Sequence, residues 1–260
     1  MTLPKSNRTL RILLPYLTLV FVLALWQLVA SLGWFLPALF PSPVDVWHAT
    51  VEMWQSGSLF KHVSASLMRV FLGYLLSVLV AVPFGFILGQ YRLLHDALTP
   101  LVQILRPISP IAWIPLAILW FGIGNKPAIF IIFITVFFPT LLTSAAAVRN
   151  IDPLIIKSAV NLGARNRDIL VKVVLPATFP SIVIGLRVTL GIAWMIIVAA
   201  EMVGMQSGLG FMILDARNFL RIDRVVSGMV IVGLIGFILD RGMVFVENVI
   251  RVKWGYQSSF

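Results

Sequence analysis

The sequence contains no cysteine among its 260 residues, so disulfides, thiolate metal sites and thiol nucleophiles are excluded. Charged residues are also scarce, because they make up 12% of the chain, against about 25% in an ordinary soluble domain. The three histidines, His48, His62 and His95, are scattered and show no metal-ligand spacing. These absences speak against an enzyme that works through a thiol or a bound metal.

Hydrophobic residues are correspondingly abundant in the sequence. They make up 60% of the chain, and the mean hydropathy is +1.00. A soluble fold of this length could not hide so much apolar surface, so lipid must be the solvent for much of the chain. The net charge of +10 is typical of Lys and Arg gathered at the ends of membrane helices, and we do not take it as a sign of nucleic-acid binding. We expect one transmembrane domain over residues 1–260.

Six apolar runs are each about long enough to cross a bilayer, which requires about 20 residues. Their approximate ranges are 12–32, 70–89, 98–121, 128–147, 182–203 and 225–246. A cleaved signal peptide is the alternative for the first run. The third run carries four prolines, Pro100, Pro107, Pro110 and Pro115, which predict a kinked helix. The fold class is therefore an all-α membrane protein with about six spans.

The distribution of Lys and Arg orients these spans. With both termini in the cytoplasm, eleven cations lie inside and six lie outside, as the positive-inside rule favours. The inner set is Lys5, Arg8, Arg11, Arg92, Arg149, Lys157, Arg165, Arg167, Lys172, Arg251 and Lys253, and the outer set is Lys61, Arg69, Lys126, Arg217, Arg221 and Arg224. We therefore expect a multi-pass protein of a bacterial inner membrane.

The longest polar segment inside the body of the chain is the loop 149–180. Asp152 suits a helix N-cap with Pro153 at the first helical position, and Gly163 suits the left-handed residue that ends a helix. A second helix is expected from about 166 to 174, closed by Leu175 and Pro176. The pattern predicts a compact helix–Gly–helix unit on the cytoplasmic side.

The letters SAVNLGA, a spacer and VVLP in this loop resemble the cytoplasmic signature of binding-protein-dependent ABC permeases. That signature reads roughly Glu-Ala-Ala, three residues, Gly, about nine residues, then Ile-x-Leu-Pro. In the family, its first helix lies in a groove of an ATPase subunit and transmits ATPase closure. The resemblance implies that the ATPase-coupling residues are Lys157, Ser158, Ala159, Leu162, Gly163, Ala164, Leu175 and Pro176. Lys157 departs from the family's acidic residue, so we hypothesise that the cognate ATPase offers an acidic groove.

Longer strings carry the same resemblance more specifically. LRPISPIAWIPLAILWFGIG (105–124), GLRVTLGIAWMIIVAAEMVGMQSGLGFMI (185–213) and DARNFLRIDRVV (215–226) are similar to permeases for sulfonates, taurine and nitrate. The resemblance implies the type I importer permease fold, in which two membrane subunits, here two copies of this chain, join two ATPases and an external solute-binding protein. The sequence has no G-x-x-x-x-G-K-[ST] loop, so ATP and Mg are expected on the partner subunit and no cofactor on this chain.

Charged and polar residues within spans are the candidates for the substrate path, because each charge there costs about 2.5–3.5 kcal/mol on insertion scales. The set is Gln103, Arg106, Trp113, Arg187, Trp194 and Glu201. An arginine fork is a natural counter-charge for a small oxyanion. The alternatives are a structural hydrogen bond for Arg106, snorkelling to headgroups for Arg187, an ion pair for Glu201, and packing for the other three.

The outer loop 204–224 shows an amphipathic helical pattern. Arg217, Arg221 and Arg224 are expected on one face of it, where they would dock an acidic patch of the solute-binding protein or attract anions. A solvated face resting on headgroups is the alternative.

The resemblance favours an importer that moves a small oxyanion by alternating access. Aliphatic sulfonate or taurine is the first choice of substrate, followed by nitrate and then bicarbonate. A membrane enzyme and a passive channel remain as alternatives from other classes, although the sequence lacks the clustered His, Asp or Glu that an enzyme would need.

Overall fold

The computed structural model describes residues 8–34, 36 and 39–253. Lys5, which was used to orient the chain, lies outside the described residues, as do the side chains of Arg8, Arg11, Arg251 and Lys253. Within the described part the secondary structure is helical, without strands. The helices are α1 (Arg8–Ser31), α2 (Pro43–Gln55), α3 (Ser58–Gln90), α4 (Arg92–Leu105), η1 (Pro110–Trp113), α5 (Ile114–Phe121), α6 (Asn125–Arg149), α7 (Pro153–Asn161), α8 (Asn166–Asp168), η2 (Ile169–Val174), α9 (Leu175–Glu201), α10 (Leu209–Asn218) and α11 (Ile222–Lys253).

The number of membrane spans agrees with the sequence prediction. Five helical segments are long and apolar enough to cross a bilayer, and a sixth span results if α4 and the segment Pro110–Phe121 count as one broken helix. The two halves of that broken span meet at an angle of 83°. Prolines explain the break, because Pro107 and Pro110 supply no N–H to continue the helical ladder. The predicted kink in the third run is thus confirmed as a sharp bend.

Two predicted helix boundaries were wrong. The helix of the second span starts at Ser58 and not near Val70, and the polar residues Ser66 and Arg69, which precede the predicted start, are buried within it. Leu175 and Pro176 do not close the second loop helix, since α8, the π-helical η2 and α9 run on without interruption to Glu201. Pro176 lies in the first turn of α9, where the missing N–H does no harm.

The described chain forms two compact units. Of the described residues, those up to 61 and 212–231 form unit 1, and 62–211 and 232–253 form unit 2, so that α3, α10 and α11 each have residues in both units. In unit 1, Ser42 and Asp45 form a capping box at the start of α2. Thr50 of α2 shares a hydrogen bond with Ser227 of α11, whose hydroxyl oxygens lie 2.6 Å apart.

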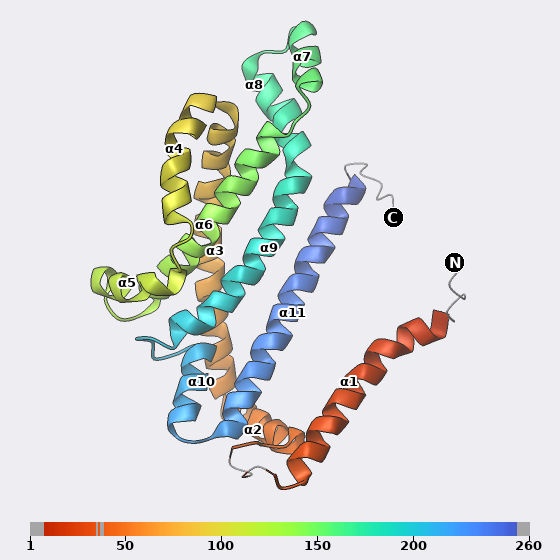
Figure 1. Cartoon of the computed structure of the whole chain (residues 1–260), viewed down its shortest axis with the longest axis vertical. Coiled ribbons are helices and arrows are strands. Elements are labelled where there is room, and N and C mark those ends of the chain that lie inside the picture. The colour runs from red at the N-terminus through yellow and green to blue at the C-terminus, as the bar shows by residue number, and fades with distance from the viewer. Residues whose placement is uncertain (1–7, 35, 37–38, 254–260) are drawn as a thin grey trace. The chain divides into compact units, whose positions relative to one another are not determined.

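The core of unit 2 forms where α3 and α9 pack against α6. Figure 1 shows α6 and α9 side by side, with α7 and α8 at one end. Gly85 of α3 lies so close to α6 that an added Cβ would overlap Leu141 and Ser144. Small residues of α3 such as Gly85 therefore serve close packing against α6.

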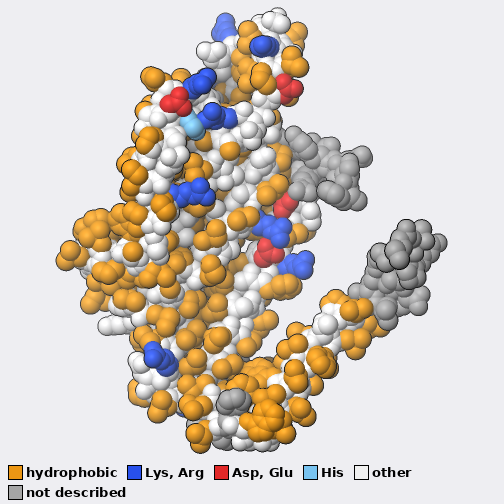
Figure 2. Space-filling model, viewed as in Figure 1, with side chains coloured by type: hydrophobic (Ala, Val, Ile, Leu, Met, Phe, Trp, Pro, Cys, Tyr) orange, Lys and Arg blue, Asp and Glu red, His pale blue; other side chains and the backbone are white. Residues whose placement is uncertain are grey.

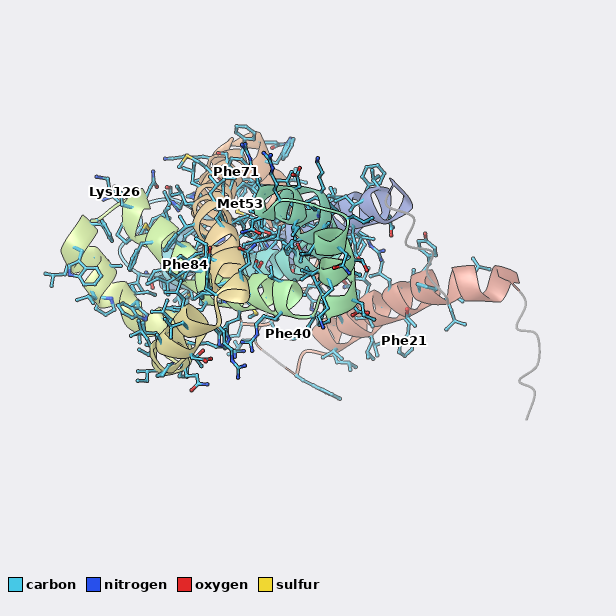
Figure 3. All side chains as sticks on the ribbon, turned by 90° about the horizontal axis from the view of Figure 1, so that it is seen from above. Phe21, Phe40, Met53, Phe71, Phe84 and Lys126 are labelled. Atoms are coloured by element: carbon cyan, nitrogen blue, oxygen red, sulfur yellow. The ribbon has the colours of Figure 1, made fainter. Side chains whose placement is uncertain are left out.

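The outer faces of unit 2 suit a lipid environment. Many large apolar side chains are exposed, including Phe71 and Phe84 of α3, which are labelled in Figure 3. Figure 2 shows hydrophobic side chains over most of the visible face, and several Lys and Arg side chains at the end where α7 and α8 lie. Such a surface would aggregate in water, and it is the expected one in a bilayer.

Candidate coupling surface and permeation path

Helix α7, which contains most of the predicted coupling residues, is defined at both ends by local sequence signals. The Asp152 carboxylate accepts a hydrogen bond of 2.8 Å from the Leu154 N–H, and Pro153 occupies the first helical position. Gly163 follows the helix with φ of +80°, a conformation that suits glycine. The predicted helix–Gly–helix unit is confirmed, and its two caps hold α7 as a rigid element.

The face that α7 turns away from the bundle is apolar. Leu154 and Ile155 are about two-thirds and half exposed, and Leu162 at the end of the helix is 88% exposed. Lys157 and Ser158 are also exposed, whereas Ala159 and Ala164 are partly buried. Within the described part of the chain nothing covers this apolar stripe, which has the form of a docking surface.

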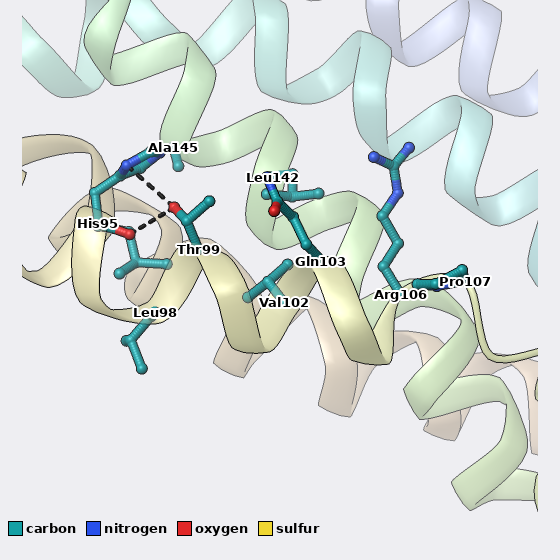
Figure 4. A pocket seen from close by; sticks show the side chains of 10 residues that line it. His95, Leu98, Thr99, Val102, Gln103, Arg106, Pro107, Leu142 and Ala145 are labelled. Carbon is teal, nitrogen blue, oxygen red and sulfur yellow. Dashed lines mark hydrogen bonds between the residues drawn. The ribbon is translucent and has the colours of Figure 1, made fainter.

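Gln103 and Arg106 line one cavity of unit 2. The cavity has a volume of about 440 Å³, and α3, α4 and α6 contribute to its walls. Figure 4 shows the side chains of Gln103 and Arg106 projecting to the same side of α4. Farther along α4, the Thr99 hydroxyl donates a 2.6 Å hydrogen bond to the His95 carbonyl. Among the described residues no carboxylate lies within ion-pair distance of Arg106, so its charge is available to an anion.

Arg187 and Trp194 lie together at a second cavity, of about 230 Å³, between α9 and α11. The Arg187 guanidinium forms a two-point ion pair with Asp240 at 2.8 and 3.1 Å, and reaches Glu247 at 3.4 Å. The Trp194 indole N–H donates to the Val232 carbonyl at 2.9 Å. Arg187 is therefore held by carboxylates, an arrangement that differs from free snorkelling to headgroups.

Glu201 is the third charged candidate, and it is buried with 1% of its surface exposed. Arg69 Nη1 lies 2.6 Å from Glu201 Oε1, the Ser66 hydroxyl donates to both carboxylate oxygens, and the Gly210 N–H donates at 3.0 Å. The remaining Arg69 donors reach the Asn125 side chain and the carbonyl and hydroxyl oxygens of Ser207. This network joins α3, α6, α9 and the loop before α10.

The sixth path candidate, Trp113, is partly buried at the end of η1. Its ring centroid lies 6.4 Å from that of Trp120 in α5, within an aromatic cluster that also contains Phe121 and Phe130. The six predicted path residues are thus spread over several places in unit 2, and only two of the cavities described here hold more than one of them.

The prediction that Arg217, Arg221 and Arg224 share one helical face was wrong. Helix α10 ends at Asn218, Leu220 takes the left-handed conformation with φ of +57°, and α11 begins at Ile222. This turn separates the three arginines, which lie on different elements of unit 1. Of the three arginines, Arg217 on α10 is exposed, whereas Arg221 and Arg224 are partly buried.

Two of these arginines are engaged by carboxylates of unit 1. Arg221 and Arg224 donate to Glu52 of α2 at 3.0 and 2.7 Å, and Arg221 also donates to Asp223. The hydrogen bond from Arg221, followed by the one from Arg224, lowers the pKa of the Glu52 carboxyl. The hydrogen bonds that Arg221 donates to Asp223 and Glu52 in turn raise the pKa of Arg221. These contacts brace the turn between α10 and α11.

Sequence reasoning missed Arg69, Asp240 and Glu247. Arg69 was counted among the outer cations, although it is 2% exposed and paired with Glu201. Topology offered a signal, because the start of the second span, with Arg69, and the end of the fifth, with Glu201, lie on the same side of the membrane in the predicted topology. Opposite charges at one depth of a membrane protein are expected to pair.

Comparison with known proteins identifies the family to which this chain belongs. The profile of the family described as binding-protein-dependent transport system inner membrane component matches residues 81–252. The chain belongs to this family of ABC transporter permeases. It is therefore a multi-pass membrane subunit of an importer.

Individual relatives support the assignment. The chain is 43% identical to a putative ABC transporter permease protein, MJ0413, of Methanocaldococcus jannaschii, over 92% of this chain and 90% of the relative. It is 34% identical to the taurine transport system permease protein TauC of Escherichia coli, over 87% and 84% of the two chains. Other relatives, at 32% and 35% identity, are named for aliphatic sulfonate transport and for nitrate import.

A solved structure supports the fold alone. The chain aligns with an inward-facing structure of the MetNI methionine ABC transporter at a TM-score of 0.66 and 19% identity. The alignment covers 76% of this chain and 97% of the other. The predicted type I importer permease fold is thereby confirmed.

Proposed function

We propose that this permease carries a small oxyanion. Aliphatic sulfonate or taurine is the substrate that we favour. Two copies of the chain would pair with two ATPase subunits, and a solute-binding protein would deliver the anion from outside. ATP and Mg would bind to the ATPases, and both termini would lie in the cytoplasm. ATPase closure, transmitted through α7, would drive alternating access.

The observation that carries the coupling role is the uncovered apolar stripe on α7. Leu162 is 88% exposed next to Gly163, and both ends of the helix are fixed by caps. A rigid amphipathic helix that buries its apolar face in a partner groove transmits force better than a mobile loop. Lys157 on the same helix adds a positive charge, which fits an acidic groove on the ATPase.

Arg106 is the residue we assign to the anion. Its guanidinium is not neutralised by any described carboxylate, and it lines a cavity beside Gln103. It also follows α4 directly at the break of a discontinuous span, the kind of place where transporters build substrate sites. Arg187 and Glu201 are less suited, because each is already held by an opposite charge.

Import of a substrate with a net negative charge, such as an alkanesulfonate or nitrate, needs an energy source. Moving one negative charge into a negative-inside cell costs about 2.3 kcal/mol per 100 mV, before any concentration gradient. Nitrate is the second candidate substrate, since a relative named for nitrate import is 35% identical over 93% of this chain. Bicarbonate follows, because it is a planar oxyanion that an arginine fork also matches.

The coupling role is tested by recovery of the ATPase with the full-length permease. Leu162→Asp would place a charge in the docking groove, and we expect it to lower the recovered ATPase by about tenfold or more. Leu93→Asp is the matched control, because Leu93 is 85% exposed at the start of α4 in the same unit. Equal recovery with both variants would contradict a docking role for α7.

The substrate is tested by uptake into proteoliposomes that contain the complete transporter, with taurine, a short alkanesulfonate and nitrate compared side by side. Arg106→Gln is expected to lower uptake of the preferred anion by about 10- to 100-fold, the value of a hydrogen bond to a charged group. Arg92→Gln, at the other and exposed end of α4, is the control. Unchanged uptake with Arg106→Gln would remove this residue from the path, and uptake without ATP would contradict an ATP-driven importer.

A further inference from the structure

The largest of the cavities described here lies behind the coupling helix in unit 2. Its volume is about 850 Å³, and its walls come from the ends of α3 and α6, from α7, and from the start of the segment that leads into α9. Apolar side chains such as Ile156 and Leu170 form part of the wall. Leu154, Ile155 and Leu162, the apolar residues that we assign to the ATPase, do not line this cavity, but Lys157 does. A ligand of the cavity and an acidic groove of the ATPase are therefore competing assignments for the Lys157 side chain.

The charge of the cavity has a single sign. Arg149, Lys157 and Arg167 line it, and none of the described lining residues is Asp or Glu. Within the described part of the chain these three cations take part in no ion pair. The two nearby acids along the chain are engaged elsewhere, since Asp168 pairs with Lys172 at 2.7 Å and Asp152 caps α7. Three uncompensated cations around one cavity attract an anion.

The cavity lies at the ends of helices that are apolar enough to cross a bilayer. Two candidate spans end at Gln90 and Arg149, and a third begins at Asn166, and all three residues line the cavity. We infer that the cavity faces the region of the phospholipid headgroups, because these helices are longer than the hydrocarbon core and extend beyond it. A cavity with both cations and apolar walls at this depth matches the phosphate and the first carbons of a lipid chain.

We propose that this cavity binds the phosphate of an anionic phospholipid through Arg149, Lys157 and Arg167. The bound headgroup bridges the coupling helix to the ends of α3 and α6. The proposal explains why this chain has Lys157 where the family has an acidic residue, because a carboxylate at this position would repel the phosphate. The proposal does not depend on which anion the permease transports.

Native mass spectrometry of the full chain in complex with its ATPases tests the site. The complex is transferred into nanodiscs of phosphatidylcholine with a minor share of phosphatidylglycerol. The number of phosphatidylglycerol molecules that stay bound to the protein is then counted after the complex is released from the nanodisc. Each cation near an anionic lipid is worth about fivefold in affinity, so R149Q/K157Q/R167Q is expected to lower phosphatidylglycerol affinity on the order of 100-fold. The control R92Q/R165Q/K172Q removes the same charge from outside the cavity, and we expect a loss below about fivefold.

Equal retention by the two triple variants would overturn the site. A wild-type complex without tightly held phosphatidylglycerol would also overturn it, and would assign the cations to the ATPase surface. A second arm separates the lipid from free phosphate, with thermal unfolding of delipidated protein measured against inorganic phosphate and against short-chain phosphatidylglycerol. Stabilisation by inorganic phosphate that equals that of the lipid would overturn the lipid as the source. Stabilisation by the lipid alone, lost in R149Q/K157Q/R167Q, is the expected result.

Discussion

The buried pair of Arg69 and Glu201 allows the sharpest test of the fold. Its nearest atoms lie 2.6 Å apart, and the two side chains are 2% and 0% exposed. Replacing Arg69 by Met leaves the carboxylate buried with only the Ser66 hydroxyl and the Gly210 N–H as donors. Removing one partner of such a pair costs about 3–5 kcal/mol.

Thermal unfolding of the purified permease measures this loss. For a chain of this size, about 3–5 kcal/mol corresponds to a fall in Tm of roughly 6–20 °C. The double variant R69M/E201Q removes both charges, and we expect it to recover most of the loss, because no buried charge is then left unpaired. The control R92M/D96N removes an exposed pair, separated by 3.8 Å, and is expected to change stability by less than about 0.5 kcal/mol.

Additive losses in R69M/E201Q would refute the reasoning, because they would show that the two charges do not stabilise each other. The same variants bear on the predicted path role of Glu201. If the residue serves only to hold the fold, Glu201→Gln lowers Tm and leaves the KM for the anion unchanged. A changed KM at unchanged Tm would instead place Glu201 in the path.

Three further predictions follow from particular residues. Gly208→Ala is expected to destabilise the fold by about 2 kcal/mol or more, because Gly208 has φ of +112° and an added Cβ would overlap the Glu201 carboxyl; Gly233→Ala, with open space around it, is the control in the same thermal assay. The pKa of Glu52 is lowered from its ordinary value of 4.5, so its stabilisation is present above that value and is lost as the pH falls through the lower folded value. The Tm of Glu52→Gln should therefore fall less than that of the wild type as the pH is lowered. The same dependence of Tm on pH in both proteins would contradict this prediction. Asp152→Ala is expected to cost α7 about 1 kcal/mol and to speed proteolysis of the loop, whereas an unchanged cleavage rate would show that the cap is dispensable.

Features encoded by neighbouring residues could be predicted from the sequence. Asp152, Pro153 and Gly163 fix the coupling helix by hydrogen bonds and backbone conformation within a dozen residues. The proline-broken span was likewise visible, because each proline acts on its own helical turn. The size of the bend was not, because it depends on packing against other helices.

Features that join distant parts of the chain could not be predicted in the same way. Arg69 and Glu201 are 132 residues apart, and apolar periodicity says nothing about their pairing. The start of the second span was placed too late for the same reason, since Ser66 and Arg69 look solvent-exposed until Glu201 is known to bury with them. The turn at Leu220 could not be predicted, because its left-handed residue is not a glycine. The three arginines on either side of it were therefore assigned to one helix.

The pairing of intramembrane charges separates structural residues from a binding residue. An arginine held on several sides, such as Arg69, cannot bind an anion without breaking the fold. Arg187 can bind one only by displacing Asp240, whose two oxygens already match the guanidinium fork. Arg106 needs no such exchange, so an anion there gains the whole charge-assisted interaction. Introducing a carboxylate near Arg106 should therefore weaken the site more than any change at Arg187. Gln103→Glu would supply this competing carboxylate, and uptake that survives it would show that the anion takes another route.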